Sequence, residues 1–96
     1  MARYFLAQLN VHDPAEYARY LEGTAPLLAE HSGRVLAVDE DVAVLEGEWP
    51  YGRTVLIEFP SADHLDAWYA SPGYREIAAH RHAASTGNAV SIEGRA

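Results

Sequence analysis

The chain has 96 residues, enough for one hydrophobic core, and residues 1–96 are expected to form a single domain. Seven arginines and no lysine oppose fourteen acidic residues, and the resulting net charge of −7 disfavours nucleic acid and anionic lipid surfaces as partners. The absence of cysteine excludes disulfide bonds, zinc–thiolate sites and a thiol nucleophile.

The first third of the chain predicts a strand followed by a helix. Residues Tyr4 to Val11 alternate along the sequence with the period of a strand. Asp13 then offers a helix cap and Pro14 a favoured first helical residue, and apolar side chains recur at helical spacing from Tyr17 to Leu28. Gly33 is the expected left-handed end of this helix.

The middle of the chain predicts extended structure interrupted by turns. Residues Arg34 to Asp39 alternate again, and Val42 to Glu46 is expected to resume a strand after an acidic turn. Trp49 to Gly52 carries the proline and glycine typical of a loop. Arg53 to Phe59 is the clearest strand of the sequence, because its β-branched and aromatic residues favour a pleated surface.

The last third predicts a helix that is broken once and then a short strand. Ser61 can cap the helix, and Ser71 followed by Pro72 restarts it. Gly87 and Asn88 are expected to end the helix, so that Ala89 to Glu93 forms the final strand.

This order of elements predicts an α+β, ferredoxin-like βαββαβ fold with an antiparallel sheet and both helices on one face. The predicted covered face consists of Phe5, Ala7, Leu9, Val11, Val55, Ile57 and Phe59. The predicted opposite face consists of Tyr4, Leu6, Gln8, Asn10, Leu36, Val38, Leu56 and Glu58. The opposite face is too apolar for open water and too polar for a dry core. We therefore expect a homodimer whose second copy covers this face and leaves its polar members around a residual cavity.

Three short motifs carry a family resemblance. They are Glu-Gly-x-Trp-Pro at residues 46–50, Glu-Phe-Pro-Ser at residues 58–61 and Trp-Tyr-x-Ser-Pro-x-Tyr at residues 68–74. With them, nearly the whole chain resembles the family called domain of unknown function 1330 (DUF1330), in the dimeric α/β-barrel superfamily. The resemblance implies a ferredoxin-like protomer, dimerisation through the sheet faces, and a pocket between the sheet and the helices or the partner. It implies no reaction.

Glu58 is the best candidate for a catalytic residue. It lies on a strand whose alternate residues are apolar, so burial could raise its pKa and make it a general base. The alternative is a structural ion pair with Arg34 or Arg53. Gln8 and Asn10 share the predicted face with Glu58, where they could bind a polar group of a ligand or satisfy backbone groups at a dimer interface.

Two aromatic residues complete the predicted ligand site. Trp49 lies in a loop, where it is free to contact a ligand or a partner subunit, and Tyr74 follows a helix start whose amides could receive an anion. Trp68 and Tyr69 are expected to be packing residues, because aromatic side chains at helical spacing usually bury themselves.

No metal site and no cofactor are expected. His80 and His82 are two positions apart on a predicted helix, which places them on different faces. No His-x-x-x-His or His-Glu-x-x-His spacing occurs, and the serines lack the sequence context of a hydrolase nucleophile.

The sequence leaves two classes of function open. The first is a homodimer that binds a small molecule at the sheet face; the second is a cofactor-independent monooxygenase or isomerase with Glu58 or a nearby histidine as base. Fold analogy within the superfamily supports the second class, and whether the chain is an enzyme stays open. No segment reaches the roughly 20 apolar residues of a membrane span and no secretory signal is recognised, so a cytoplasmic protein without a membrane partner is expected.

Overall fold

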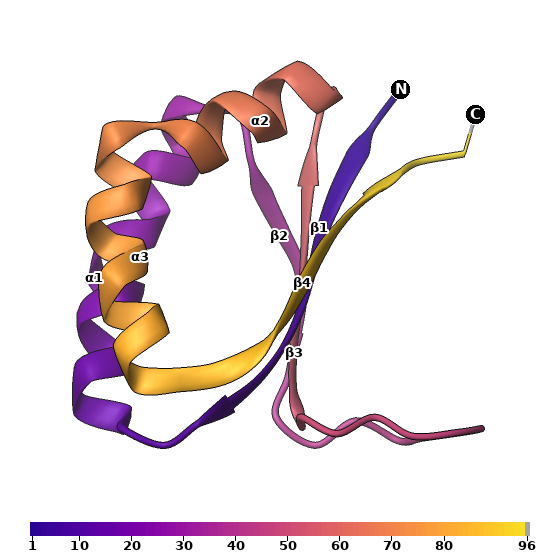
Figure 1. Ribbon diagram of the computed structural model, residues 1–96. Coiled ribbons are helices and arrows are strands. Elements are labelled where there is room, and N and C mark those ends of the chain that lie inside the picture. Colours follow the sequence, from indigo (N-terminus) through magenta and orange to yellow (C-terminus); the bar gives the residue numbers. More distant parts are fainter. Residues whose placement is uncertain (96) are drawn as a thin grey trace.

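The computed structural model describes residues 1–95, which form four strands and three helices. In chain order these are β1 (Arg3–Val11), α1 (Pro14–Glu30), β2 (Arg34–Asp39), β3 (Arg53–Phe59), α2 (Ala62–Ala70), α3 (Pro72–Ala84) and β4 (Ser85–Glu93). The strands pair antiparallel in the order β2-β3-β1-β4. All three helices cover one face of the sheet and leave the other uncovered (Figure 1). The predicted ferredoxin-like α+β fold is confirmed.

The helices begin where the capping residues predict. The side chain of Asp13 accepts a hydrogen bond of 3.2 Å from the amide of Glu16 at the start of α1. Ser61 caps α2 in the same way, and Ser71 accepts from the amide of Tyr74 to start α3. The break at Ser71 is therefore confirmed as the boundary between two helices.

The end of α1 differs from the prediction. Ser32, with φ of 60°, adopts the left-handed conformation that was expected of Gly33. Gly33 is constrained by space instead, since a Cβ there would lie 2.8 Å from the ring of Phe59 and 2.8 Å from Leu28. The glycine lets the chain enter β2 directly above the core.

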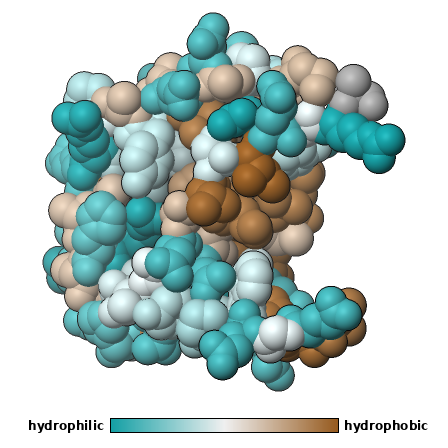
Figure 2. All heavy atoms as spheres, turned by 45° about the vertical axis from the view of Figure 1, so that its right-hand side comes forward, coloured by the Kyte–Doolittle hydropathy of each residue, from teal (hydrophilic) through white to brown (hydrophobic). Residues whose placement is uncertain are grey.

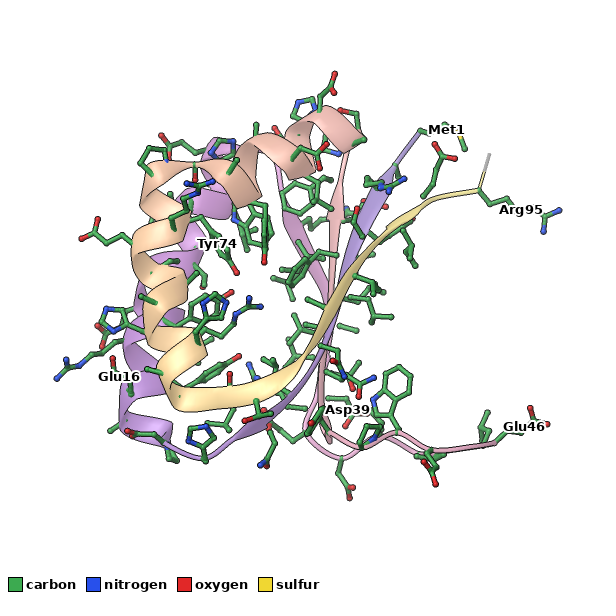
Figure 3. The ribbon with its side chains drawn as sticks, viewed as in Figure 1. Met1, Glu16, Asp39, Glu46, Tyr74 and Arg95 are labelled. Carbon is green, nitrogen blue, oxygen red and sulfur yellow. The ribbon has the colours of Figure 1, made fainter. Side chains whose placement is uncertain are left out.

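The expected strand from Val42 to Glu46 is wrong. Residues 40–52 form a loop that projects from the sheet on the side away from the helices, with Glu46 at its tip (Figures 1 and 3). Leu45 is 91% exposed, so within the described protomer this segment has no apolar surface against which to form a strand.

The last strand is longer than predicted. It begins at Ser85 rather than Ala89, and Gly87 and Asn88 lie inside it, opposite Leu9 and Gln8 of β1. A Cβ on Gly87 would lie 2.1 Å from the carbonyl oxygen of Gln8. This glycine therefore serves the close approach of two strands and does not end the helix.

The core lies between the helices and the sheet. Trp68 is at its centre, with its ring centroid 4.2 Å from that of Tyr74, 5.2 Å from Phe5 and 5.1 Å from Phe59. The prediction that Trp68 is a packing residue is confirmed, whereas Tyr69 beside it packs against the same aromatic rings but is 44% exposed. None of the helices within residues 1–95 is long and apolar enough to cross a membrane.

The uncovered face of the sheet, called here the outer face, is apolar at its centre. Leu6, Leu56 and Val90 lie side by side on it, and Figure 2 shows the exposed apolar patch. Val38 was predicted for this face, and that prediction is wrong. A bulge between Val35 and Ala37 shifts the alternation of β2 by one, so Val38 pairs with Val55 and faces the helices.

Candidate functional site

Glu58 lies on the outer face and is bonded to two neighbours. Its carboxylate accepts a hydrogen bond of 2.8 Å from Arg34 and one of 3.1 Å from the hydroxyl of Tyr4. This is the structural ion pair with Arg34 that was the alternative to a general base. The hydrogen bond to Glu58 is the main reason why the pKa of Tyr4 is raised.

Three other predicted ligand residues belong to the same face. Gln8 is half-buried opposite Thr54 and Asn88, and its side-chain oxygen is buried without a hydrogen-bond partner among residues 1–95. Trp49 donates its indole hydrogen to the hydroxyl of Thr54 over 2.9 Å and is 37% exposed. Asn10 is exposed near the end of β1. The structure thus places all four of these predicted residues on the outer face.

Tyr74 lies on the other side of the sheet. It is fully buried between the helices and the sheet (Figure 3), and its hydroxyl forms a 2.9 Å hydrogen bond with that of Tyr20. Burial is the main cause that raises the pKa of both phenols, and in Tyr20 it raises the pKa far above the ordinary value of 10. Both groups therefore stay protonated. Tyr74 cannot share a site with Glu58.

The helix side of the sheet contains a cavity of about 80 Å³. Elements α1, α2, α3, β1, β2 and β3 all contribute to its walls, which are mostly aliphatic and aromatic. Its polar or aromatic lining residues are Phe5, Tyr17, Tyr20, Thr24, Arg53, Trp68 and Arg81. No carboxylate and no imidazole lines it among residues 1–95. This partly open cavity is the candidate site of the protomer, and its polar groups are chiefly hydrogen-bond donors.

Two arginines line this cavity, and they differ in whether an acidic side chain balances their charge. Arg53 forms an ion pair with Glu40 and donates a 3.1 Å hydrogen bond to the hydroxyl of Tyr17. Arg81 is only 5% exposed and has no carboxylate partner within residues 1–95. The cavity therefore carries one neutralised and one uncompensated positive charge.

Arg81, Tyr20 and Tyr17 were missed as site residues by the sequence prediction. Tyr74, Ala78 and Arg81 follow one another at steps of four and three residues and are all buried. An arginine in that stripe, where an apolar residue belongs, was the signal for a buried charge. No group of three His, Asp or Glu residues within the described chain is placed to hold a metal ion.

Solved structures of similar proteins share this fold. A protein of unknown function from Rhodopseudomonas palustris is 19% identical, with a TM-score of 0.82 over 99% of this chain and 83% of its own. A dimeric ferredoxin-like protein of unknown function from a Jannaschia species is 18% identical, with a TM-score of 0.72 over 98% of this chain and 100% of its own. SnoaB, a cofactor-independent oxygenase from Streptomyces nogalater, is 21% identical, with a TM-score of 0.69 over 99% of this chain and 94% of its own. At these identities the likeness shows the fold alone.

The sequence itself was also compared with known families. No curated protein matches it. The model of the family described as a domain of unknown function (DUF1330) matches residues 2–95, which is nearly the whole chain. The protein therefore belongs to the DUF1330 family.

Proposed function

We propose that this protein binds a small molecule in the cavity between the sheet and helices α1 and α3, with one site in each protomer of a homodimer. The observation that carries the proposal is the composition of that cavity. Apolar walls from six elements surround a few polar groups, a lining that is usual for a small-molecule site. The wall residues Phe5 and Trp68 belong to the core, so this part of the wall is fixed before any ligand arrives.

The homodimer part of the proposal rests on the outer face. Leu36, Val90 and Ile92 are each more than two-fifths exposed there, and an apolar sheet face of this kind is normally covered by a partner. Proteins with the same fold are described as dimeric. A second copy is the occupant that we propose, because the face is flanked by the projecting loop at residues 40–52, which would reach beside that copy (Figure 1).

The predicted ligand residues Gln8, Asn10, Trp49 and Glu58 would then lie at or near the interface between the two sheets. Gln8 is half-buried there, and its side-chain oxygen lacks a hydrogen-bond partner among residues 1–95. Their role in binding a ligand stays a prediction, separate from the cavity on the helix side.

The alternative function is a cofactor-independent monooxygenase or isomerase. It is supported less well than binding. Glu58, the proposed base, is held by Arg34 and Tyr4 and is separated from the cavity by the sheet. The cavity has no carboxylate or imidazole in its lining within residues 1–95 that could take the place of Glu58.

The binding proposal is tested by isothermal titration calorimetry with two small probes, benzyl alcohol and benzoate. We expect at least one of them to bind the wild-type protein with roughly millimolar or tighter affinity. Ala7 is buried and lines the cavity, so Ala7→Leu fills it and should weaken that binding, whereas Ala79→Leu on the exposed side of α3 should not. Absence of binding by both probes, or equal binding in Ala7→Leu, would contradict the proposal.

A further inference from the structure

Arg81 is a charged side chain placed where the fold itself gives it no counter-ion. It projects from α3, is 5% exposed, and has no carboxylate within 4.0 Å among residues 1–95. Burying an unpaired charge strongly destabilises a protein, so such groups are normally paired or shifted to neutrality. Arginine cannot take the second route, because its pKa lies too high.

The surroundings of Arg81 compensate its charge only in part. Its guanidinium carbon lies 5.8 Å from the ring centroid of Tyr20 and 6.0 Å from that of Phe5. One guanidinium nitrogen lies 3.1 Å from Nε2 of His82. Desolvation and the neighbouring Arg81 lower the pKa of His82, which keeps that imidazole neutral and able to accept. A neutral acceptor leaves the positive charge in place.

The phenols of the core cannot supply the missing anion either. Tyr20 lines the cavity and its hydroxyl is bonded to that of Tyr74, and burial raises the pKa of both. They remain neutral at any pH at which the protein would function. No group within residues 1–95 therefore supplies a negative charge beside Arg81.

Two buried donors lack partners beside the same cavity. Nε of Arg81 and Nε1 of Trp68 are both buried without a hydrogen-bond partner among residues 1–95, and both residues line the cavity. A buried N–H without an acceptor costs free energy comparable to a lost hydrogen bond, so a ligand whose acceptor reached these two donors would remove that cost.

We propose that the ligand of this cavity is a small monocarboxylate with an apolar body, whose carboxylate accepts hydrogen bonds from Arg81 and Trp68. This inference rests on the proposed function and names its ligand class. One carboxylate balances the single unpaired guanidinium, and the aliphatic and aromatic walls suit an apolar body. A dianionic phosphate fits less well, because only one cation of the cavity is free of an acidic partner within residues 1–95.

The test compares benzoate with benzyl alcohol, which has nearly the same body without the charge. The wild-type protein should bind benzoate at least about tenfold more tightly, since a hydrogen bond to a charged group is worth that factor or more. Arg81→Met should remove this preference and leave the affinity for benzyl alcohol within about twofold. Arg34→Met, which removes the same charge from the outer face, should preserve the preference.

Two further measurements keep the test decisive if Arg81→Met does not fold well enough for titration. Trp68→Phe keeps an aromatic ring but removes the indole donor, and it should weaken benzoate binding several-fold more than benzyl alcohol binding. The thermal midpoint of unliganded Arg81→Met should equal or exceed that of the wild type, because the variant removes an uncompensated buried charge. A purely structural arginine would lower that midpoint.

The outcomes separate the two proposals. If benzyl alcohol and benzoate bind equally well to the wild type and to Arg81→Met, the cavity is a ligand site but the carboxylate inference is overturned. If neither probe binds, the proposed function fails and the inference fails with it. A preference for benzoate that survives in Arg81→Met but is lost in Arg34→Met would move the anion site to the outer face and overturn the inference.

Discussion

The hydroxyl groups of Tyr20 and Tyr74 lie 2.9 Å apart inside the protein, although 54 positions separate the two residues in the sequence. Their rings meet edge to face, with centroids 6.1 Å apart. Tyr20 comes from α1 and Tyr74 from the first turn of α3, so the pair joins the two long helices above the sheet. Tyr20 also lines the cavity, which makes this contact part of its wall.

Removing one of these hydroxyls should destabilise the protein. Tyr74→Phe leaves the hydroxyl of Tyr20 buried without its partner, and we expect the free energy of unfolding to fall by about 0.5 to 1.5 kcal/mol. Urea denaturation of both single variants and of the double variant measures the coupling between the two groups. If the decreases in the free energy of unfolding of the two single variants add up to that of the double variant, the hydrogen bond does not contribute to stability.

Stability should fall at alkaline pH for the same reason. The pKa values of Tyr20 and Tyr74 are raised in the folded protein, so their contribution is complete below the unfolded pKa of about 10. Above that pH the unfolded chain releases these protons and the folded chain retains them, which favours unfolding. The chain has no lysine and no cysteine, so tyrosines dominate this range, and Tyr4, whose pKa is also raised, contributes in the wild type and in the variant alike. Denaturation between about pH 8 and 11 should show a steeper loss in the wild type than in Tyr20→Phe; equal slopes would contradict this account.

His82 should make the protein less stable at mildly acidic pH. Its pKa is lowered in the folded protein, chiefly by desolvation and further by Arg81. The stabilising contribution is therefore complete above the unfolded pKa of about 6.5 and is lost as the pH falls from there through the lower folded pKa. Replacing His82 with Gln should flatten the stability profile between about pH 7 and 5. A profile unchanged by His82→Gln would show that other groups cause the acid loss.

Gly33→Ala should be distinctly destabilising. The added Cβ would lie 2.8 Å from the fully buried ring of Phe59, which has no room to move, and overpacking of this kind costs about 1 to 3 kcal/mol. Gly73→Ala is a matched control, because its added Cβ would also lie at 2.8 Å but from the flexible end of Leu27. Thermal denaturation should separate the two variants. If both variants lost a similar amount of thermal stability, the ring of Phe59 would be able to move aside for the added Cβ.

The proposed homodimer predicts that a charge on the outer face produces monomers. Val90 is half-exposed at the centre of the apolar patch, so Val90→Glu should lower the molar mass measured by light scattering from that of two chains to that of one. Leu21 is exposed on α1, and Leu21→Glu should leave the mass unchanged. A wild-type protein that is monomeric at micromolar concentration would rule out the dimer.

Most of the fold could be predicted from local patterns. Alternation identified β1 and β3, and the caps Asp13, Ser61 and Ser71 located three helix starts. The errors arose where tertiary contacts override a local rule. Gly87 was predicted to end a helix, but a glycine is required there because the strand approaches Gln8 closely. The bulge in β2 moves Val38 to the other face of the sheet, and alternation along the sequence does not reveal a bulge.

The candidate site was harder to predict, because it depends on which side of the sheet each residue faces. Gln8 and Glu58 were placed correctly on one face, but Tyr74 lies on the opposite side among the helices. The uncompensated charge of Arg81 is a property of its three-dimensional surroundings. The sequence places an arginine in a buried stripe, whereas only the structure shows that no carboxylate within residues 1–95 reaches it.

The most direct test of the proposed site uses the two indole groups of the chain. Trp68 lines the cavity and Trp49 lies on the outer face, so their two indole N–H signals in an NMR spectrum report on opposite sides of the sheet. Trp49→Phe assigns the signals. Titration with benzoate is expected to shift the Trp68 signal with saturation and to leave that of Trp49 in place. A saturable shift of Trp49 alone would place the ligand on the outer face and contradict the proposed site.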